Sequence, residues 1–420
     1  MRVVWTKRTA PFGEPWRQGD ATEERGVKGR LSRWVVRCAI VTWVASGLLA
    51  LPGRADVSVE RGSSIIIFPK VISDDDGLLT RGFPVETIIQ ISNTSNSLAF
   101  AHCFYVNAAP LDPRQPPGPF NPPQWQEVDF DLVLTKQQPT YWVVGQGRRV
   151  DPTDPQCSRV PPVFSCPNAG FDPGAIPAVP PNFQGQLVCI EVDSAGAPLN
   201  GNRLKGEATL VTPRSTTVNG VTMRQGEVSK YNAIGIAGLN TDTNSNDGDL
   251  TLCIGGNPRP GCPAGAEYNG CPDTVIVNHF GERATMPALP ANDIPNSRVE
   301  TEVTLVPCTQ DFENQVPGSV VVQFRVTNEF ENLFSASTTV TCWSNFRLAE
   351  VGRIFDASFL GTRFAQTRMT PGGIEQPGFL GVSEEFYNDG RGVLSRAALN
   401  LHVEGVRPGG DVITIPEVAP

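Results

Sequence analysis

One stretch of the sequence carries oxygen side chains at alternating positions, which is the pattern of a calcium-binding loop. Its five candidate ligands are Asp242, Asn244, Asn246, Asp247 and Asp249. Two positions depart from the usual loop, because Asp247 stands where the sharp turn needs glycine and Cys253 stands where a bidentate glutamate belongs. Runs of Asn, Asp and Gly also favour tight turns, so a polar hairpin tip is the competing interpretation. Residues 73–77, with their consecutive aspartates, form a second acidic turn of the same kind.

Pairs of glutamates are the second candidate for chemistry, because a glycosidase needs two carboxyl groups held at a fixed separation across a cleft. The candidates are Glu329 and Glu331 in a predicted turn, Glu384 and Glu385 in a later strand, and Glu191 at the matching position of an earlier strand. Solvated turn and strand positions also explain these glutamates. An extracellular hydrolase is therefore kept as an alternative.

The histidines His102, His279 and His402 each lie in an apolar, strand-like run, where a lone histidine is usually packed or on the surface. Cys103 follows His102, but neighbours on a strand point to opposite faces and form no nucleophile–base pair. The sequence contains no serine-hydrolase elbow, zinc-protease motif, phosphate loop or dinucleotide fingerprint. We therefore predict that the chain is not an enzyme and holds no cofactor, with calcium as the one candidate metal.

A secretory signal is predicted at residues 28–55. Basic residues open it, a 14-residue apolar run at 38–51 follows, and Gly53 and Ala55 supply small residues before a cut after Ala55. The apolar run is shorter than the roughly 20 residues that span a bilayer, so we expect cleavage rather than anchoring. Residues 1–26 lack periodicity, so either the true start is Val27 or the basic region is unusually long. We exclude residues 1–55 from the fold.

Nine cysteines follow the predicted cut, at positions 103, 157, 166, 189, 253, 262, 271, 308 and 342. A zinc site is disfavoured, because no Cys-x-x-Cys pair or nearby histidine pair occurs. In an exported chain these cysteines predict disulfides, and the odd number leaves one thiol free or paired between chains. The hypotheses for pairing are Cys103 with Cys189 between two sheets, Cys308 with Cys342, Cys157 with Cys166, and two of Cys253, Cys262 and Cys271 with each other.

Composition predicts an acidic all-β protein. The chain has 34 basic and 43 acidic residues, and removal of residues 1–55 leaves 24 and 39. Such a surface repels nucleic acid, so we predict no nucleic-acid partner, and we predict no integral membrane segment after signal cleavage. The 41 glycines and 38 prolines punctuate short runs rich in Val, Ile, Thr and Phe, which is typical of β-sandwiches.

The order of strand and turn signals predicts two tandem β-sandwich units, residues 56–211 and 301–420, joined by a cysteine-containing segment, residues 212–300. Strand, asparagine, turn, strand and cysteine follow one another at 86–103 and again at 320–342. Two proline-rich stretches, 109–124 and 152–181, lengthen the first unit. Proline cannot donate to a sheet ladder, so these stretches are predicted loops that cover a sheet edge or form a recognition surface.

Residues 88–106, with an Ile-Gln-Ile-Ser-Asn-Thr-Ser-Asn turn followed by a Cys-Phe-Tyr strand, resemble hairpins in immunoglobulin-like domains of secreted bacterial proteins. The resemblance implies an immunoglobulin-like sandwich and carries no catalytic or binding residue. Together these features predict an exported, disulfide-stapled structural or binding protein, periplasmic, secreted or associated with the cell surface. Its partner would be an unidentified protein or glycan. A calcium-dependent carbohydrate- or protein-binding module and an extracellular hydrolase are the alternatives.

Overall fold

The computed structural model describes residues 57–416, except for positions 81, 116–119, 149–173, 219–220, 240–249, 264, 285–297, 374–375, 389–392 and 408. Nearly all of the described secondary structure is β-strand, so the predicted all-β class is confirmed. Three short helical turns interrupt it: α2 (Leu348–Val351), η1 (Arg353–Phe355) and α3 (Ala357–Leu360). A helix with the length and apolar character needed to span a membrane is not found among the described residues.

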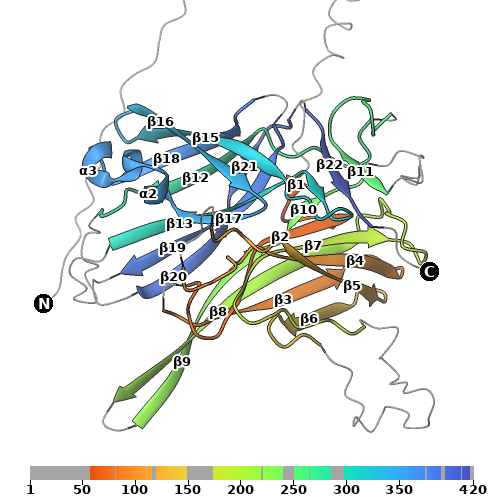
Figure 1. Ribbon diagram of the computed structural model, residues 1–420, viewed down its shortest axis with the longest axis horizontal. Coiled ribbons are helices and arrows are strands. Elements are labelled where there is room, and N and C mark those ends of the chain that lie inside the picture. Colours follow the sequence, from red (N-terminus) through yellow and green to blue (C-terminus); the bar gives the residue numbers. More distant parts are fainter. Residues whose placement is uncertain are drawn as a thin grey trace, which may run out of the picture. The chain divides into compact units, whose positions relative to one another are not determined.

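The first half of the described chain builds one large antiparallel sheet (Figure 1). Its ten strands are β1 (Val57–Ser58), β2 (Ile65–Asp74), β3 (Val85–Asn93), β4 (Ala99–Asn107), β5 (Gln126–Leu134), β6 (Pro139–Val143), β7 (Phe183–Val192), β8 (Leu204–Val218), β9 (Val221–Asn232) and β10 (Ile234–Ile236). The main path runs β5-β4-β7-β2-β3-β8-β9, while β10 pairs with β1 and β2, and β6 pairs with β3. We call this the ten-stranded sheet.

The second half contributes three smaller sheets. The five-stranded sheet has the order β16 (Leu333–Thr341), β15 (Ser319–Asn328), β18 (Phe364–Pro371), β12 (Thr274–Phe280) and β21 (His402–Glu404). The four-stranded sheet has the order β17 (Ser344–Arg347), β13 (Arg298–Pro307), β19 (Phe379–Asn388) and β20 (Val393–Asn400). The three-stranded sheet has the order β11 (Thr251–Ile254), β22 (Asp411–Thr414) and β14 (Gln310–Asp311).

The four-stranded sheet is a middle layer between the other two large sheets (Figure 1). Val303 and Leu305 of β13 pack in one core with Val322 and Phe324 of the five-stranded sheet. Val382 of β19 and Ala398 of β20 instead belong to the core of the ten-stranded sheet. Strands β3 and β15 show why these layers form, because their side chains alternate between buried and less buried positions, the period of two that a strand requires. Both halves therefore meet at the four-stranded sheet.

The two segments on which the predicted duplication depends differ in pairing. In the second half, β15 and β16 form an antiparallel hairpin. In the first half, β3 pairs with β2, β6 and β8, whereas β4 pairs with β5 and β7. Of the predicted connecting segment, 212–300, strands β11 and β12 lie inside second-half sheets. The tandem arrangement and the immunoglobulin-like topology stay predictions.

Disulfides join six of the described cysteines. Cys103 bonds to Cys189, the pair that the sequence suggested, but the two lie opposite each other on neighbouring strands β4 and β7. The bond is therefore within one sheet, and the expectation of a bridge between sheets is wrong. Cys253 bonds to Cys262, while Cys157 and Cys166 lie outside the described residues.

The predicted pair Cys308–Cys342 is also wrong. Cys308 bonds to Cys271, because the chain brings the start of the second half against the segment before β12 rather than against the end of β16. Cys342 is the free cysteine of the described part of the chain. It is buried, and burial raises the pKa of its thiol.

Candidate functional site

A β-bulge in β2 positions the most unusual charged group of the protein. Phe68 lies opposite Leu187 of β7 and Val71 lies opposite Gly185, so the register shifts between them and Pro69 and Lys70 interrupt the regular pairing. Proline cannot donate a ladder hydrogen bond, which makes this the natural place for the shift. Bulges of this kind redirect a side chain out of the normal alternation. Here the bulge carries Lys70, which is only 2% exposed.

Side chains from distant strands satisfy the backbone groups of the bulge. The amide of Lys70 donates to the Tyr231 hydroxyl at 3.1 Å, and the same hydroxyl donates to the carbonyl oxygen of Lys70 at 2.5 Å. The indole Nε1 of Trp343, which follows β16, donates to the carbonyl oxygen of Pro69 at 2.6 Å. Because buried backbone groups must be hydrogen-bonded, these contacts make the bulge a fixed part of the structure.

The ammonium group of Lys70 lies between two glutamates of the four-stranded sheet. Its Nζ is 2.5 Å from Oε1 of Glu302 on β13 and 2.8 Å from Oε2 of Glu384 on β19. These carboxylates are at most 8% exposed, so none of the three charges is well solvated. Burial alone would lower the pKa of Lys70, but the two carboxylates outweigh burial and raise it. Lys70 is therefore an ammonium ion at rest.

A second cation completes the charge balance. Arg396 of β20 contacts Oε1 of Glu384 through Nη2 at 2.5 Å and Nε at 2.6 Å, and its Nη1 donates to Thr212 at 2.7 Å. The hydroxyl of Ser229 donates to the same Glu384 oxygen at 3.1 Å. We call Lys70, Glu302, Glu384 and Arg396 the charge cluster. It contains two positive and two negative groups and joins strands of two sheets.

The charge cluster forms part of the wall of a cavity of about 660 Å³. The proline-rich stretch 109–124 supplies another part of this wall through Pro110, Pro113 and Arg114, so the described part of that loop does line a recess. Phe386 lies beside both cations, with its ring centroid 6.0 Å from Nζ of Lys70 and 5.4 Å from Cζ of Arg396. These are cation–π distances.

Of the glutamates singled out from sequence, the structure brings Glu384 into this site. Glu329 and Glu331 lie in the exposed turn between β15 and β16. Glu385 points away from the cluster because neighbours on a strand face opposite sides, and burial raises the pKa of its carboxyl group. Sequence reasoning missed Lys70 and Glu302. The available signal was a single charge inside an apolar run, Ile-Ile-Ile-Phe-Pro-Lys-Val-Ile, in a strand whose every residue is buried.

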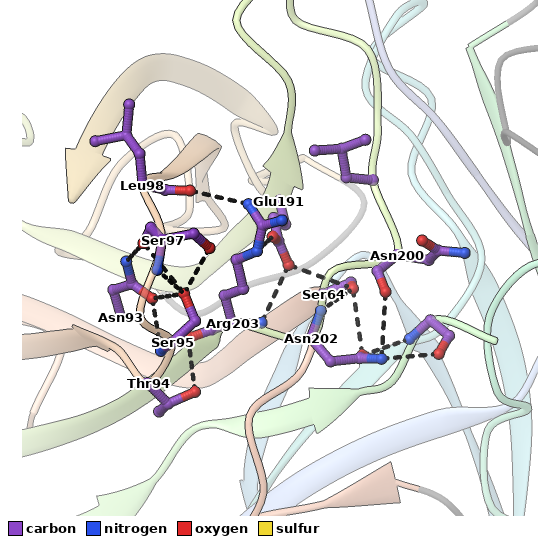
Figure 2. Close-up of polar contacts among 12 residues, drawn as sticks. Ser64, Asn93, Thr94, Ser95, Ser97, Leu98, Glu191, Asn200, Asn202 and Arg203 are labelled. Carbon is purple, nitrogen blue, oxygen red and sulfur yellow. Dashed lines mark hydrogen bonds and ion pairs between the residues drawn. The ribbon is translucent and has the colours of Figure 1, made fainter. Parts of the chain in front are cut away.

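Glu191 lies in a separate buried network at the end of β7 (Figure 2). Its carboxylate contacts Nε of Arg203 at 3.2 Å and accepts from the Arg203 amide at 3.1 Å. The nearby hydroxyl of Ser64 accepts from the amide of Asn202 at 2.9 Å. The Asn202 side chain donates to the carbonyl oxygens of Asn200 and Gly238 and accepts from the amide of Gly238. The partners are mostly backbone groups, so the network fixes the β1–β2 loop, the β7–β8 loop and the segment that follows β10.

The pKa of Glu191 gives a testable pH dependence. Burial raises it to about 7 from an ordinary value of 4.5, so the folded protein binds more protons than the unfolded chain between these two pH values. The free energy of unfolding contributed by this group therefore falls as the pH rises through that window. We expect Glu191→Gln to remove this loss, so that its stability relative to the wild type increases from about pH 5 to about pH 8. Urea midpoints at several pH values measure the difference, and a difference that does not change with pH would contradict the assignment.

The three histidines lie on different strands, away from the charge cluster. His279 is buried on β12, its Nε2 is 2.8 Å from the Thr367 hydroxyl, and burial lowers its pKa to about 4. His102 on β4 has Nδ1 at 2.6 Å from Oδ1 of Asp131 across the β4–β5 pair. His402 is exposed on β21. None of them lines the cavity.

The sequence suggested two acidic segments as calcium sites, and the structure describes one of them. Asp242, Asn244, Asn246, Asp247 and Asp249 lie outside the described residues. In the acidic turn at 73–77, the carboxylate of Asp74 accepts the amides of Leu78, Leu79 and Thr80 and the Thr80 hydroxyl. These bonds are those of a carboxylate that orders a turn.

One further group of metal-ligating residue types comes together in the described chain. Cys271, Cys308 and buried Asp411 lie close enough to share an ion. Because the two sulfurs are joined to each other, neither is a thiolate that could bind a metal. Asp411 instead accepts from the amide of Gly378 and the hydroxyl of Thr309.

No protein-family model matches the chain, and no curated protein matches it.

Proposed function

We propose that this chain is an exported, non-catalytic protein with a structural or binding role outside the cytoplasm. The observation that carries the proposal is the charge cluster, because its two cations and two carboxylates neutralise one another and join the ten-stranded to the four-stranded sheet. Disulfides support an exported protein, since such bonds persist in oxidising compartments. Both features stabilise a large β-structure.

Export is tested on the native protein. We expect cell fractionation to place it outside the cytoplasm, N-terminal sequencing to begin after Ala55, and thiol titration of the denatured chain to show most cysteines oxidised. A cytoplasmic protein that retains residues 28–55 and has titratable thiols throughout would overturn the proposal.

A binding role would use the cavity. Its rim includes exposed Arg114 of the proline-rich loop, and loops on a rigid sheet framework commonly carry recognition. The ligand would be a polar glycan or a protein segment that complements a mixed-charge wall. Arg114→Ala is expected to weaken such binding on a glycan array, whereas loss of the exposed Lys230 charge on β9 should leave it unchanged.

A hydrolase is the second candidate, because Glu302 and Glu384 both line the cavity. Lys70 contacts both carboxylates, so the pair faces a fixed cation rather than an open space for a sugar. We therefore rank this function below the structural one. Release of reducing sugar from a polysaccharide panel by the wild type, but not by Glu302→Gln, would reverse the ranking. A calcium-dependent module is tested separately by titration calorimetry and by the melting temperature with and without calcium.

A further inference from the structure

The charge cluster places an amine next to a side-chain amide. Nζ of Lys70 lies 3.3 Å from Oδ1 of Asn345, while the same Nζ contacts Oε1 of Glu302 at 2.5 Å. Asn345 is on β17, which pairs with β13 so that Asn345 lies opposite Thr304, two residues from Glu302. An amine, a carboxylate and a carboxamide from three strands therefore meet at one point.

We propose that Lys70 and Asn345 join spontaneously in an intramolecular amide bond. In the first step the Lys70 ammonium passes one proton to Glu302 along their hydrogen bond. The neutral amine then forms a bond from Nζ to Cγ of Asn345. A second proton moves from Nζ to Nδ2 of Asn345, the Cγ–Nδ2 bond breaks, and ammonia leaves. Glu302 keeps the first proton, so one ion pair becomes one neutral amide and one neutral carboxylic acid.

The surroundings supply what this step requires. The hydroxyl of Thr304 donates to Oδ1 of Asn345 at 2.7 Å, where it stabilises the negative charge that develops on that oxygen. The reacting groups are held together by a folded sheet, which replaces a bimolecular encounter by a preset contact. Lys70 and Glu302 are at most 8% exposed, which limits the access of water that would compete as a nucleophile.

The reaction would also change the charge balance of the site. A buried ion pair carries a desolvation penalty that its own attraction does not always repay. Conversion of Lys70 and Glu302 to neutral groups removes that penalty. Glu384 would lose the Lys70 ammonium from Oε2 but keep its contacts with Arg396 and Ser229 through Oε1. The bond would join β2 of the ten-stranded sheet covalently to β17 of the four-stranded sheet. It goes beyond the proposed function, because it would replace the Lys70–Glu302 ion pair by a covalent link between the same two sheets. If the bond does not form, the ion pair remains and the proposed function is unaffected.

Peptide mapping of the folded, full-length protein after reduction and alkylation tests the bond. Trypsin would not cleave at an amidated Lys70, so peptide 62–81 should appear joined to peptide 326–347, lighter than their sum by one ammonia. Recovery of the separate peptides 62–70 and 326–347 in full yield from folded wild-type protein would overturn the proposal. This measurement needs no variant, so it stays decisive even where a substitution prevents folding.

Variants identify the roles of the three groups. Asn345→Ala should abolish the branched peptide, and Glu302→Gln should reduce it at least tenfold, because glutamine cannot accept the lysine proton. Asn345→Asp should give the same branched product with loss of water in place of ammonia. Lys230→Met, which removes an exposed lysine paired with Glu207, is the matched control and should leave the branched peptide unchanged. A branched peptide that survives Asn345→Ala would place the bond elsewhere and contradict the proposal.

Discussion

Replacement of Glu384 by glutamine is expected to lower the free energy of unfolding by about 3–5 kcal/mol, which is typical for removal of one partner from a buried ion pair. Glu384 is 1% exposed and is the shared partner of Lys70 and Arg396. Glutamine keeps the shape but not the charge, so Arg396 would be left buried without its carboxylate. Urea denaturation followed by circular dichroism at neutral pH measures the loss.

The matched control is Glu207→Gln, because Glu207 pairs with Lys230 on the surface of β8 and β9, where the side chains are 37% and 47% exposed. An exposed pair of this kind contributes roughly 0–1 kcal/mol. Equal losses in the two variants would show that burial of the charge cluster has no energetic consequence, and would contradict its stabilising role.

Removal of the Cys103–Cys189 bond by a double alanine substitution is expected to have the second large effect. The bond closes a loop with a sequence separation of 86. In the chain-entropy model, a closure of that length restricts the unfolded state by about 4.5 kcal/mol. Both cysteines are fully buried, so a cavity term adds to the loss. The urea midpoint of the folded variant gives the change.

The control for loop length is the Cys253–Cys262 bond, whose cysteines are also buried but whose sequence separation is 9. The same model gives about 2.5 kcal/mol for this closure. A Cys253–Cys262 double alanine variant that loses as much stability as the Cys103–Cys189 variant would argue against the entropic origin of the difference.

The strands were predictable because their signal is local. In β3 and β15, residues at buried and less buried positions alternate along the sequence, which is the period of two of a strand. Glycine and proline mark where strands end. The pairing of strands was not predictable in the same way. The two strand–turn–strand segments read alike, yet β3 and β4 pair with other strands while β15 and β16 pair with each other. Which strands become neighbours depends on packing across the whole chain.

Most residues of the candidate site could not be predicted from sequence, because they too depend on strand pairing. Glu384 was named as part of a glutamate pair, but Lys70, Glu302 and Asn345 are far apart in the chain and match no motif. The bulge at Pro69 and Lys70 brings them together, and a bulge follows from the register of β2 against β7. The errors in the cysteine pairing have the same origin, since Cys308 meets Cys271 through tertiary contacts that spacing does not encode.

We expect the charge cluster to make the ten-stranded sheet and the second-half sheets one cooperative body. Native-state hydrogen exchange in increasing urea, followed by mass spectrometry of peptides from β7 and β15, tests it most directly. We predict that both strands open with the same free energy in the wild type and with different free energies in Glu384→Gln. Independent opening of β7 and β15 in the wild type would contradict the claim.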